Sequence, residues 1–119
     1  MHIHHLALRV RDFEKSLHFY QTLTELKIHT QFSANGGSIA YLQNASGETQ
    51  LELIGMPGGE TVKASGMFLC FGTEDIAEAH ERAVLHGMNP SDIRQPEPDA
   101  RYFYVYDPDG LSVQVREYR

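Results

Sequence analysis

The pattern of apolar and polar positions in this chain occurs twice. The segment His5–Phe13 aligns with Phe68–Ile76 at an offset of 63 residues. In both copies apolar side chains alternate with other residues and the run ends near an acidic residue, which is typical of a half-buried strand. A repeat on this scale predicts a chain built from two copies of one structural unit.

A helix is predicted directly after each of these strands. Asp12 and Asp75 each precede a run with apolar residues at helical spacing. Aspartate is a favoured N-cap residue, and Glu78 follows Asp75 by three residues, as in a capping box. We therefore expect helices over roughly residues 12–25 and 75–87.

Each predicted helix is followed by strand-like runs around a glycine turn. The sequence Asp-Pro-Asp-Gly at 107–110 suits a type I turn. The first and last strands are spaced alike in the two copies, with 47 residues from His5 to Glu52 and 46 from Phe68 to Gln114. Glycine and proline mark residues 56–65 as a linker, and prolines mark 89–99 as a loop. The strand-like runs are 38–42, 49–54, 101–106 and 112–116.

Composition narrows the possible functions. The 119 residues suffice for one domain, and the net charge of −6 disfavours binding to nucleic acid or to an anionic membrane surface. No apolar run is long enough to span a bilayer. The start of the chain has no apolar signal region, so we expect a cytoplasmic protein. A single cysteine, Cys70, excludes an internal disulfide.

Taken together, these segments resemble the vicinal oxygen chelate superfamily, which includes glyoxalases, extradiol dioxygenases and bleomycin resistance proteins. The resemblance rests on residues 5–12, on Leu51-Glu52-Leu53 and on the turn at 107–110. It covers nearly the whole chain. It implies an α+β fold in which residues 1–119 form a single domain of two βαβββ modules, about 2–55 and 66–118, joined by the linker. Each module would curl into half a barrel around a cleft, and the protein would form a homodimer.

The alternation of strand residues predicts which side chains face that cleft. Leu6, Leu8 and Val10 should lie under the first helix, which places His5, Ala7 and Arg9 on the cleft side. The same reasoning assigns to the cleft the side chains of Glu52, Phe68, Cys70, Tyr102, Tyr104, Tyr106, Gln114 and Arg116.

The resemblance implies metal ligands at four cleft positions, of which three carry a donor atom. His5 and Glu52 match the first module's ligands, and Gln114 keeps a carbonyl oxygen where the family has glutamate. Phe68 replaces a histidine and has no donor atom. The implied cofactor is therefore none, or a weakly bound divalent metal ion such as Ni, Zn, Mn or Fe.

The same substitutions discriminate between enzyme classes. Dioxygenases need two histidines and a carboxylate on iron, and of these ligands the chain retains only His5 at the family positions. A glyoxalase-like lyase or isomerase needs a carboxylate base, for which Glu52 is the catalytic candidate. Binding of an organic ligand without metal is compatible with both substitutions.

Several residues allow two interpretations. Glu52 either has a functional role or pairs with Arg9 or Arg116. These two arginines either grip an anionic ligand or pair with Glu52 or Glu117. The tyrosines at 102, 104 and 106 form a wall for a planar ligand, or reflect ordinary strand propensity.

The remaining candidates are two histidines at the start of the chain and the cysteine in the segment that begins at Phe68. His2 and His4 are interpreted as solvated terminal residues, with His4 pointing away from His5. Cys70 lies on the cleft side, where we interpret it as a small apolar filler. We expect a protein that binds a small organic ligand, with a metal-dependent lyase or isomerase using His5, Glu52 and Gln114 as the alternative.

Overall fold

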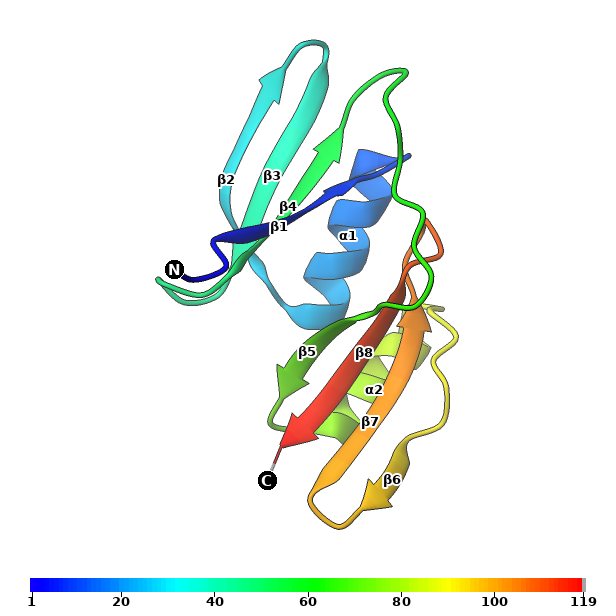
Figure 1. The fold of residues 1–119 in the computed structure, drawn as a ribbon. Helices are drawn as coiled ribbons and strands as arrows, with labels where there is room; N and C mark the ends of the chain where they lie inside the picture. The colour runs from blue at the N-terminus through cyan, green and yellow to red at the C-terminus, as the bar shows by residue number, and fades with distance from the viewer. Residues whose placement is uncertain (119) are drawn as a thin grey trace. The chain divides into compact units, whose positions relative to one another are not determined.

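The computed structural model describes residues 1–118 and contains two βαβββ modules (Figure 1). The first module consists of β1 (His5–Arg9), α1 (Phe13–Thr24), β2 (Lys27–Ala34), β3 (Gly37–Gln43) and β4 (Gln50–Gly55). The second consists of β5 (Leu69–Thr73), α2 (Ile76–Leu85), β6 (Arg94–Glu97), β7 (Ala100–Tyr106) and β8 (Ser112–Tyr118). The α+β fold with two such modules is confirmed, and both helices lie where the sequence predicted them.

The two sheets have the same topology. Their strand orders are β1-β4-β3-β2 and β5-β8-β7-β6. In each sheet the first and last strands of the module pair in parallel, and the other neighbours pair antiparallel. Leu6 lies opposite Leu51 in one parallel ladder, and Leu69, its equivalent at the offset of 63 residues, lies opposite Val113 in the other. Equivalent residues of the two modules therefore take equivalent places on their sheets.

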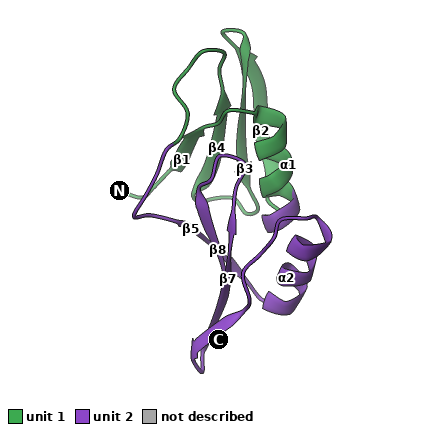
Figure 2. Ribbon diagram, turned by 90° about the vertical axis from the view of Figure 1, so that its right-hand side faces the viewer, with its two compact units in different colours: residues 1–21, 25–62 green, residues 22–24, 63–119 purple. Residues whose placement is uncertain are grey.

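The chain divides into two compact units, which are described separately (Figure 2). The first holds residues 1–21 and 25–62, and the second holds residues 22–24 and those from 63 onward. Arg82 of α2 donates from Nε and Nη2 to the carbonyls of Thr22 and Leu23, at 3.0 and 2.9 Å. These bonds satisfy two carbonyl groups that the end of α1 leaves without intrahelical donors.

Both helices begin at the aspartates expected from the sequence. Asp12 accepts from the backbone N–H of Lys15, and Asp75 accepts from that of Glu78, each at 3.1 Å. A second carboxylate, from Glu117 on β8, accepts from the N–H of Ile76 at 2.9 Å. Two acidic side chains therefore satisfy the first turn of α2 and complement its dipole.

The apolar sides of the strands face the helices and form the core of each unit. Leu53 is fully buried in the first unit, as are Phe103 and Val113 in the second. Leu8 and Val10 are buried as predicted, but Leu6 is 42% exposed because β1 forms the edge of its sheet. The expectation that Leu6, Leu8 and Val10 are all buried under the helix was therefore wrong for Leu6.

One segment expected to be a loop contains a strand. Arg94–Glu97 forms β6, which pairs with β7 and carries Pro96. An edge strand tolerates proline because its outer N–H groups need no partner, and here the pairing shifts register between Arg94 and Glu97. Neither helix among residues 1–118 is long and apolar enough to cross a membrane.

Candidate functional site

In the first unit three neighbouring strands bring together an imidazole, a carboxylate and a phenol. Glu52 on β4 lies opposite Ala7 of β1 and opposite Tyr41 of β3. His5, two residues before Ala7, therefore projects from the same sheet face. Its Nε2 is 3.3 Å from Oε1 of Glu52, and its ring meets the Tyr41 ring edge-on at 5.6 Å between centroids.

Glu52 is the buried member of this group. It is 7% exposed, and an unpaired carboxylate would be costly to bury there. The Tyr41 hydroxyl donates to it, and this hydrogen bond, partial desolvation and the nearby negative charge raise the pKa of Tyr41 above its ordinary value of 10.0. Within its unit Glu52 is thus paired with His5 and Tyr41, and not with Arg9.

His4 contacts His5, contrary to the expectation that the two side chains point apart. Their Nδ1 atoms are 2.8 Å apart, a hydrogen bond in which one ring donates and the other accepts. The strand begins at His5, so His4 lies outside the alternation on which the expectation rested. His5 therefore has a polar contact at each ring nitrogen.

The second unit repeats this arrangement with different chemistry. Gln114 on β8 lies opposite Cys70 of β5 and Tyr104 of β7, as Glu52 lies opposite Ala7 and Tyr41. Its Nε2 donates to the Tyr104 hydroxyl at 2.8 Å, and its Oε1 accepts from the Cys70 thiol at 3.1 Å. Phe68 meets the Tyr104 ring edge-on at 5.5 Å, as His5 meets Tyr41.

Cys70 is an exposed thiol and not the apolar filler that we expected. Besides its bond to Gln114, it interacts with Tyr118 on β8. The charge that the thiol carries when ionised, a hydrogen bond to it and partial burial raise the pKa of Tyr118, while Arg116 opposes the shift. This sheet face therefore presents a thiol and phenols beside the buried amide.

Arg116 lies between two tyrosine rings on this face. Its guanidinium carbon is 5.6 Å from the ring centroid of Tyr102 and 5.3 Å from that of Tyr118. Tyr102 in turn meets Tyr104 edge-on at 5.7 Å, and Tyr106, further along β7, is 71% exposed.

From the sequence, Arg9 and Arg116 were considered as ion-pair partners of Glu117, but its partner is a different arginine. Glu117 pairs with Arg101, with Nη2 to Oε2 at 2.9 Å, on the helix-facing side of the sheet. The structure gives no ion pair between Glu117 and Arg116 within the described residues. Arg9 is exposed on β1, and its backbone carbonyl accepts from Val62 N–H at 2.7 Å.

The donor atoms within each unit do not make a complete metal site. Among residues 1–118, no three histidine, cysteine or acidic side chains gather in a way that would hold a metal ion. His5 and Glu52 supply two donors in the first unit. In the second, Phe68 supplies none and the Gln114 carbonyl already accepts from Cys70. The residues therefore fit at most a weakly held ion.

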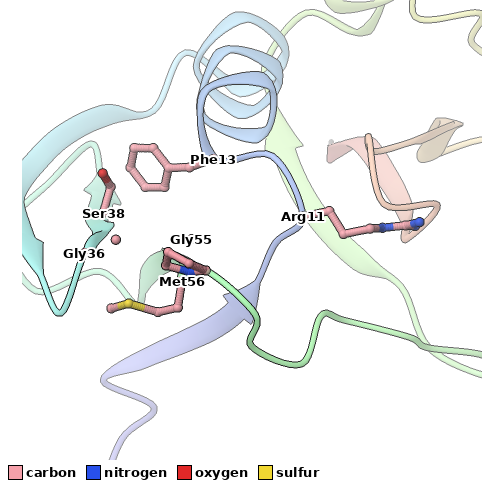
Figure 3. A pocket seen from close by; sticks show the side chains of 8 residues that line it. Arg11, Phe13, Gly36, Ser38, Gly55 and Met56 are labelled. Carbon is pink, nitrogen blue, oxygen red and sulfur yellow. The ribbon is translucent and has the colours of Figure 1, made fainter.

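A cavity of about 290 Å³ lies elsewhere in the first unit, beside the β2–β3 turn (Figure 3). Phe13, Ser38, Gly55 and Met56 line it, and the Arg11 side chain extends away from these residues. Its lining includes none of the side chains that the sequence assigned to a site. Its lining includes three glycines and no acidic or histidine side chain, so we do not take it as the candidate site.

Three residues that complete these groups were not candidates from the sequence, namely Tyr41, Tyr118 and Arg101, and His4 was interpreted as a solvated terminal residue. For Tyr41 a signal was available, because it precedes Tyr104 by 63 residues, the same offset that relates His5 to Phe68. The other three depend on side-chain directions at strand ends and on the helix side of the sheet, which alternation does not specify.

Similar proteins were found at the levels of sequence and structure. The chain is 30% identical to the Bacillus subtilis protein YwbC over 118 residues, covering 94% of each chain. Its fold matches the trypanothione-dependent glyoxalase I of Leishmania major with a TM-score of 0.80 and 20% identity, covering 98% of this chain and 86% of that one. It also matches TnmS3, an antibiotic-binding protein from Streptomyces sp. CB03234, with a TM-score of 0.78 and 20% identity, covering 100% and 97% of the two chains.

The family model for the Glyoxalase/Bleomycin resistance protein/Dioxygenase superfamily matches residues 2–115. The two modules described above have the fold of that superfamily. This chain belongs to the Glyoxalase/Bleomycin resistance protein/Dioxygenase superfamily.

Proposed function

We propose that this protein binds a small organic ligand through the sheet face that carries Phe68, Tyr104 and Gln114, without requiring a metal ion. The supporting observation is Phe68, a 47% exposed ring packed edge-on against Tyr104. A metal ligand at this position would need a donor atom, whereas a phenyl ring offers apolar contact worth about 1.5–3 kcal/mol when fully covered.

The neighbouring polar groups suit an organic ligand. The buried Gln114 amide and the Tyr104 hydroxyl hold each other at 2.8 Å, so both are oriented before a ligand arrives. Such preorganised donors and acceptors among aromatic side chains are typical of small-molecule sites. TnmS3, which has the same fold, is an antibiotic-binding protein.

A titration with small aromatic compounds, followed by NMR, tests this proposal. We expect shifts concentrated at Phe68, Tyr104 and Gln114, and we expect Phe68→Ala to weaken binding at least about tenfold, the equivalent of 1.4 kcal/mol. Leu85→Ala is the matched control, because Leu85 is a 76% exposed apolar residue on α2. Equal effects of the two substitutions would contradict the proposal.

A second candidate, a metal-dependent glyoxalase-like lyase or isomerase, is favoured by the His5–Glu52 pair at 3.3 Å. In this alternative His5, Glu52 and Gln114 are ligands and Glu52 is the catalytic base. Metal analysis of protein purified without a histidine tag or a metal column separates the two functions. Stoichiometric metal that is lost in His5→Ala would favour the enzyme.

We further propose that the protein is a cytoplasmic homodimer, as the resemblance to its family suggested. The exposed edges of its sheets support the dimer. A dimer could cover such an edge by pairing or packing.

A further inference from the structure

Arg116 lies beside two tyrosine rings on the ligand face, and its guanidinium group can still bind an acceptor. Tyr102 and Tyr118 lie against the guanidinium group at 5.6 and 5.3 Å, distances typical of cation–π contacts. The hydrogen-bond donors of a guanidinium group lie in its plane and point from its edge. The two tyrosine rings contact the guanidinium group without supplying a carboxylate or carbonyl acceptor, so its donors are left for another acceptor.

Nothing among residues 1–118 neutralises this charge by an ion pair. Arg101 and Glu117 pair with each other on the helix side of the sheet, and Arg116 Nε is a buried donor without an acceptor. On the β5 side, the residue in register with Arg116 is Gly72, which has no side chain to compete for the guanidinium edge. Arg116 is half-buried, and a partly desolvated cation with an unsatisfied donor favours an anionic acceptor.

The aromatic rings near Arg116 also indicate which kind of molecule bears the anionic group. Tyr102 contacts Tyr104 at 5.7 Å, and Tyr104 contacts Phe68 at 5.5 Å, so aromatic rings continue from Arg116 to the exposed phenyl group. The rings of this aromatic strip meet edge-on, with 81° and 89° between neighbouring planes. A ligand that spans it needs a negative charge at one end and an aromatic body at the other.

We propose that Arg116 is the anion subsite of the ligand face and that the ligand is an aromatic carboxylate. The carboxylate would accept a forked pair of hydrogen bonds from the guanidinium edge, and the aromatic body would cover Tyr104 and Phe68. This inference rests on the proposed function, since it uses the same sheet face. Beyond the proposed function, the inference specifies that the ligand is an anion and that Arg116 is the residue that recognises its charge.

The net charge of the protein makes the test specific. At −6 the chain as a whole repels anions, so a preference for an acid over its neutral amide must come from a local contact. The probes are 2-naphthoate and 2-naphthamide, which share shape and aromatic surface and differ in charge. We expect the acid to bind at least about tenfold more tightly, in the range of a charge-assisted hydrogen bond.

Three variants assign this preference to a residue. Arg116→Gln should abolish the preference for the acid while leaving binding of the amide within about twofold, and Arg116→Lys should retain part of the preference. Lys63→Gln is the control: it removes the same charge from an exposed position of the linker, outside the strands of the ligand face. The variant should keep the preference. A two-dimensional NMR spectrum of each variant confirms that the fold is retained.

The outcomes distinguish this inference from the proposed function. If wild-type protein binds both probes equally at the Phe68 face, the anion subsite is refuted and the proposed function stands. Equal losses in Arg116→Gln and Lys63→Gln would also refute it, because the preference would then reflect the general field. If neither probe binds, both proposals fail.

Discussion

At the residue scale, the two modules place different chemistry on the same scaffold. Tyr41 and Tyr104 occupy equivalent positions, but they flank a carboxylate, Glu52, in one unit and an amide, Gln114, in the other. From the sequence, Glu52 and Gln114 were both predicted to lie on the sheet face away from the helices, because side chains alternate between the two faces of any strand. The hydrogen-bond partners were not predictable, since they depend on rotamers and on neighbouring strands that lie far away in sequence.

The hydrogen bond between Tyr41 and Glu52 predicts an alkaline loss of stability. The folded state raises the pKa of Tyr41, so folding favours the protonated phenol. Its contribution is complete below the ordinary pKa of 10.0 and is lost as the pH rises through the raised value. Wild type should therefore exceed Tyr41→Phe in stability at neutral pH, with the difference shrinking as the phenol ionises.

Urea unfolding of both proteins across the alkaline range checks this prediction. Tyr106→Phe is the control, because Tyr106 is 71% exposed and its removal should not change the pH dependence. A difference between wild type and Tyr41→Phe that stays constant with pH would contradict the expectation.

Restoring the two missing family ligands should create metal affinity. The double variant Phe68→His with Gln114→Glu adds an imidazole and a carboxylate, both good ligands for nickel and zinc. We expect its affinity for these ions to exceed that of wild type by at least about tenfold, with weaker binding of aromatic probes. Calorimetric titration measures the gain, and Phe32→His, the same kind of substitution at a 45% exposed position of β2, controls for incidental surface binding. A double variant no better than this control would show that the family positions are wrongly assigned.

At the scale of elements, long periodic segments were predictable and short polar edges were not. Both helices carry an N-cap aspartate and a clear apolar stripe, so their starting points followed from the sequence. The edge strands β2 and β6 have almost no buried residues, so alternation left no signal in them. Pro96 even argued against β6, because its place at an edge is a tertiary feature.

Glu117 joins β8 to the first turn of α2, and its substitution should be costly. Glu117→Gln weakens the bond to Ile76 N–H and leaves the partly buried Arg101 without its counter-ion. We expect a loss of about 1.5–3 kcal/mol in the free energy of unfolding. Urea unfolding at neutral pH measures it.

The matched control for Glu117 is Glu78→Gln. Glu78 forms an i,i+4 pair with Arg82 at 3.6 Å, with its side chain 67% exposed. Such a pair contributes about 0.3–0.5 kcal/mol. Losses of similar size in the two variants would show that burial of the Glu117 pair adds little.

At the scale of the whole molecule, the repeat made the fold predictable. Two copies of one hydrophobic pattern, with first and last strands 47 and 46 residues apart, imply two similar modules before any residue is placed. The oligomeric state was not predictable from the repeat. The residues that would cover an edge strand in a dimer have no packing role within an isolated module, so the repeat does not identify them.

The homodimer remains a prediction, and β2 gives it a physical basis. This edge strand of eight residues is exposed at every position except the last, and it carries Ile28 and Phe32, which are 40% and 45% exposed. Unprotected edges of this kind favour association. Light scattering after size exclusion should give twice the chain mass of 13.5 kDa. A monomer mass at all concentrations would contradict the prediction.

The parallel ladders between β1 and β4 and between β5 and β8 also govern how the chain reaches this fold. Every described strand pairing lies within one module, so paired residues are never further apart in sequence than the length of a module. Hairpins such as β7–β8 are local and close early, whereas each parallel ladder must wait until its module's first strand meets its last. Loop-closure entropy makes that late step the slow one.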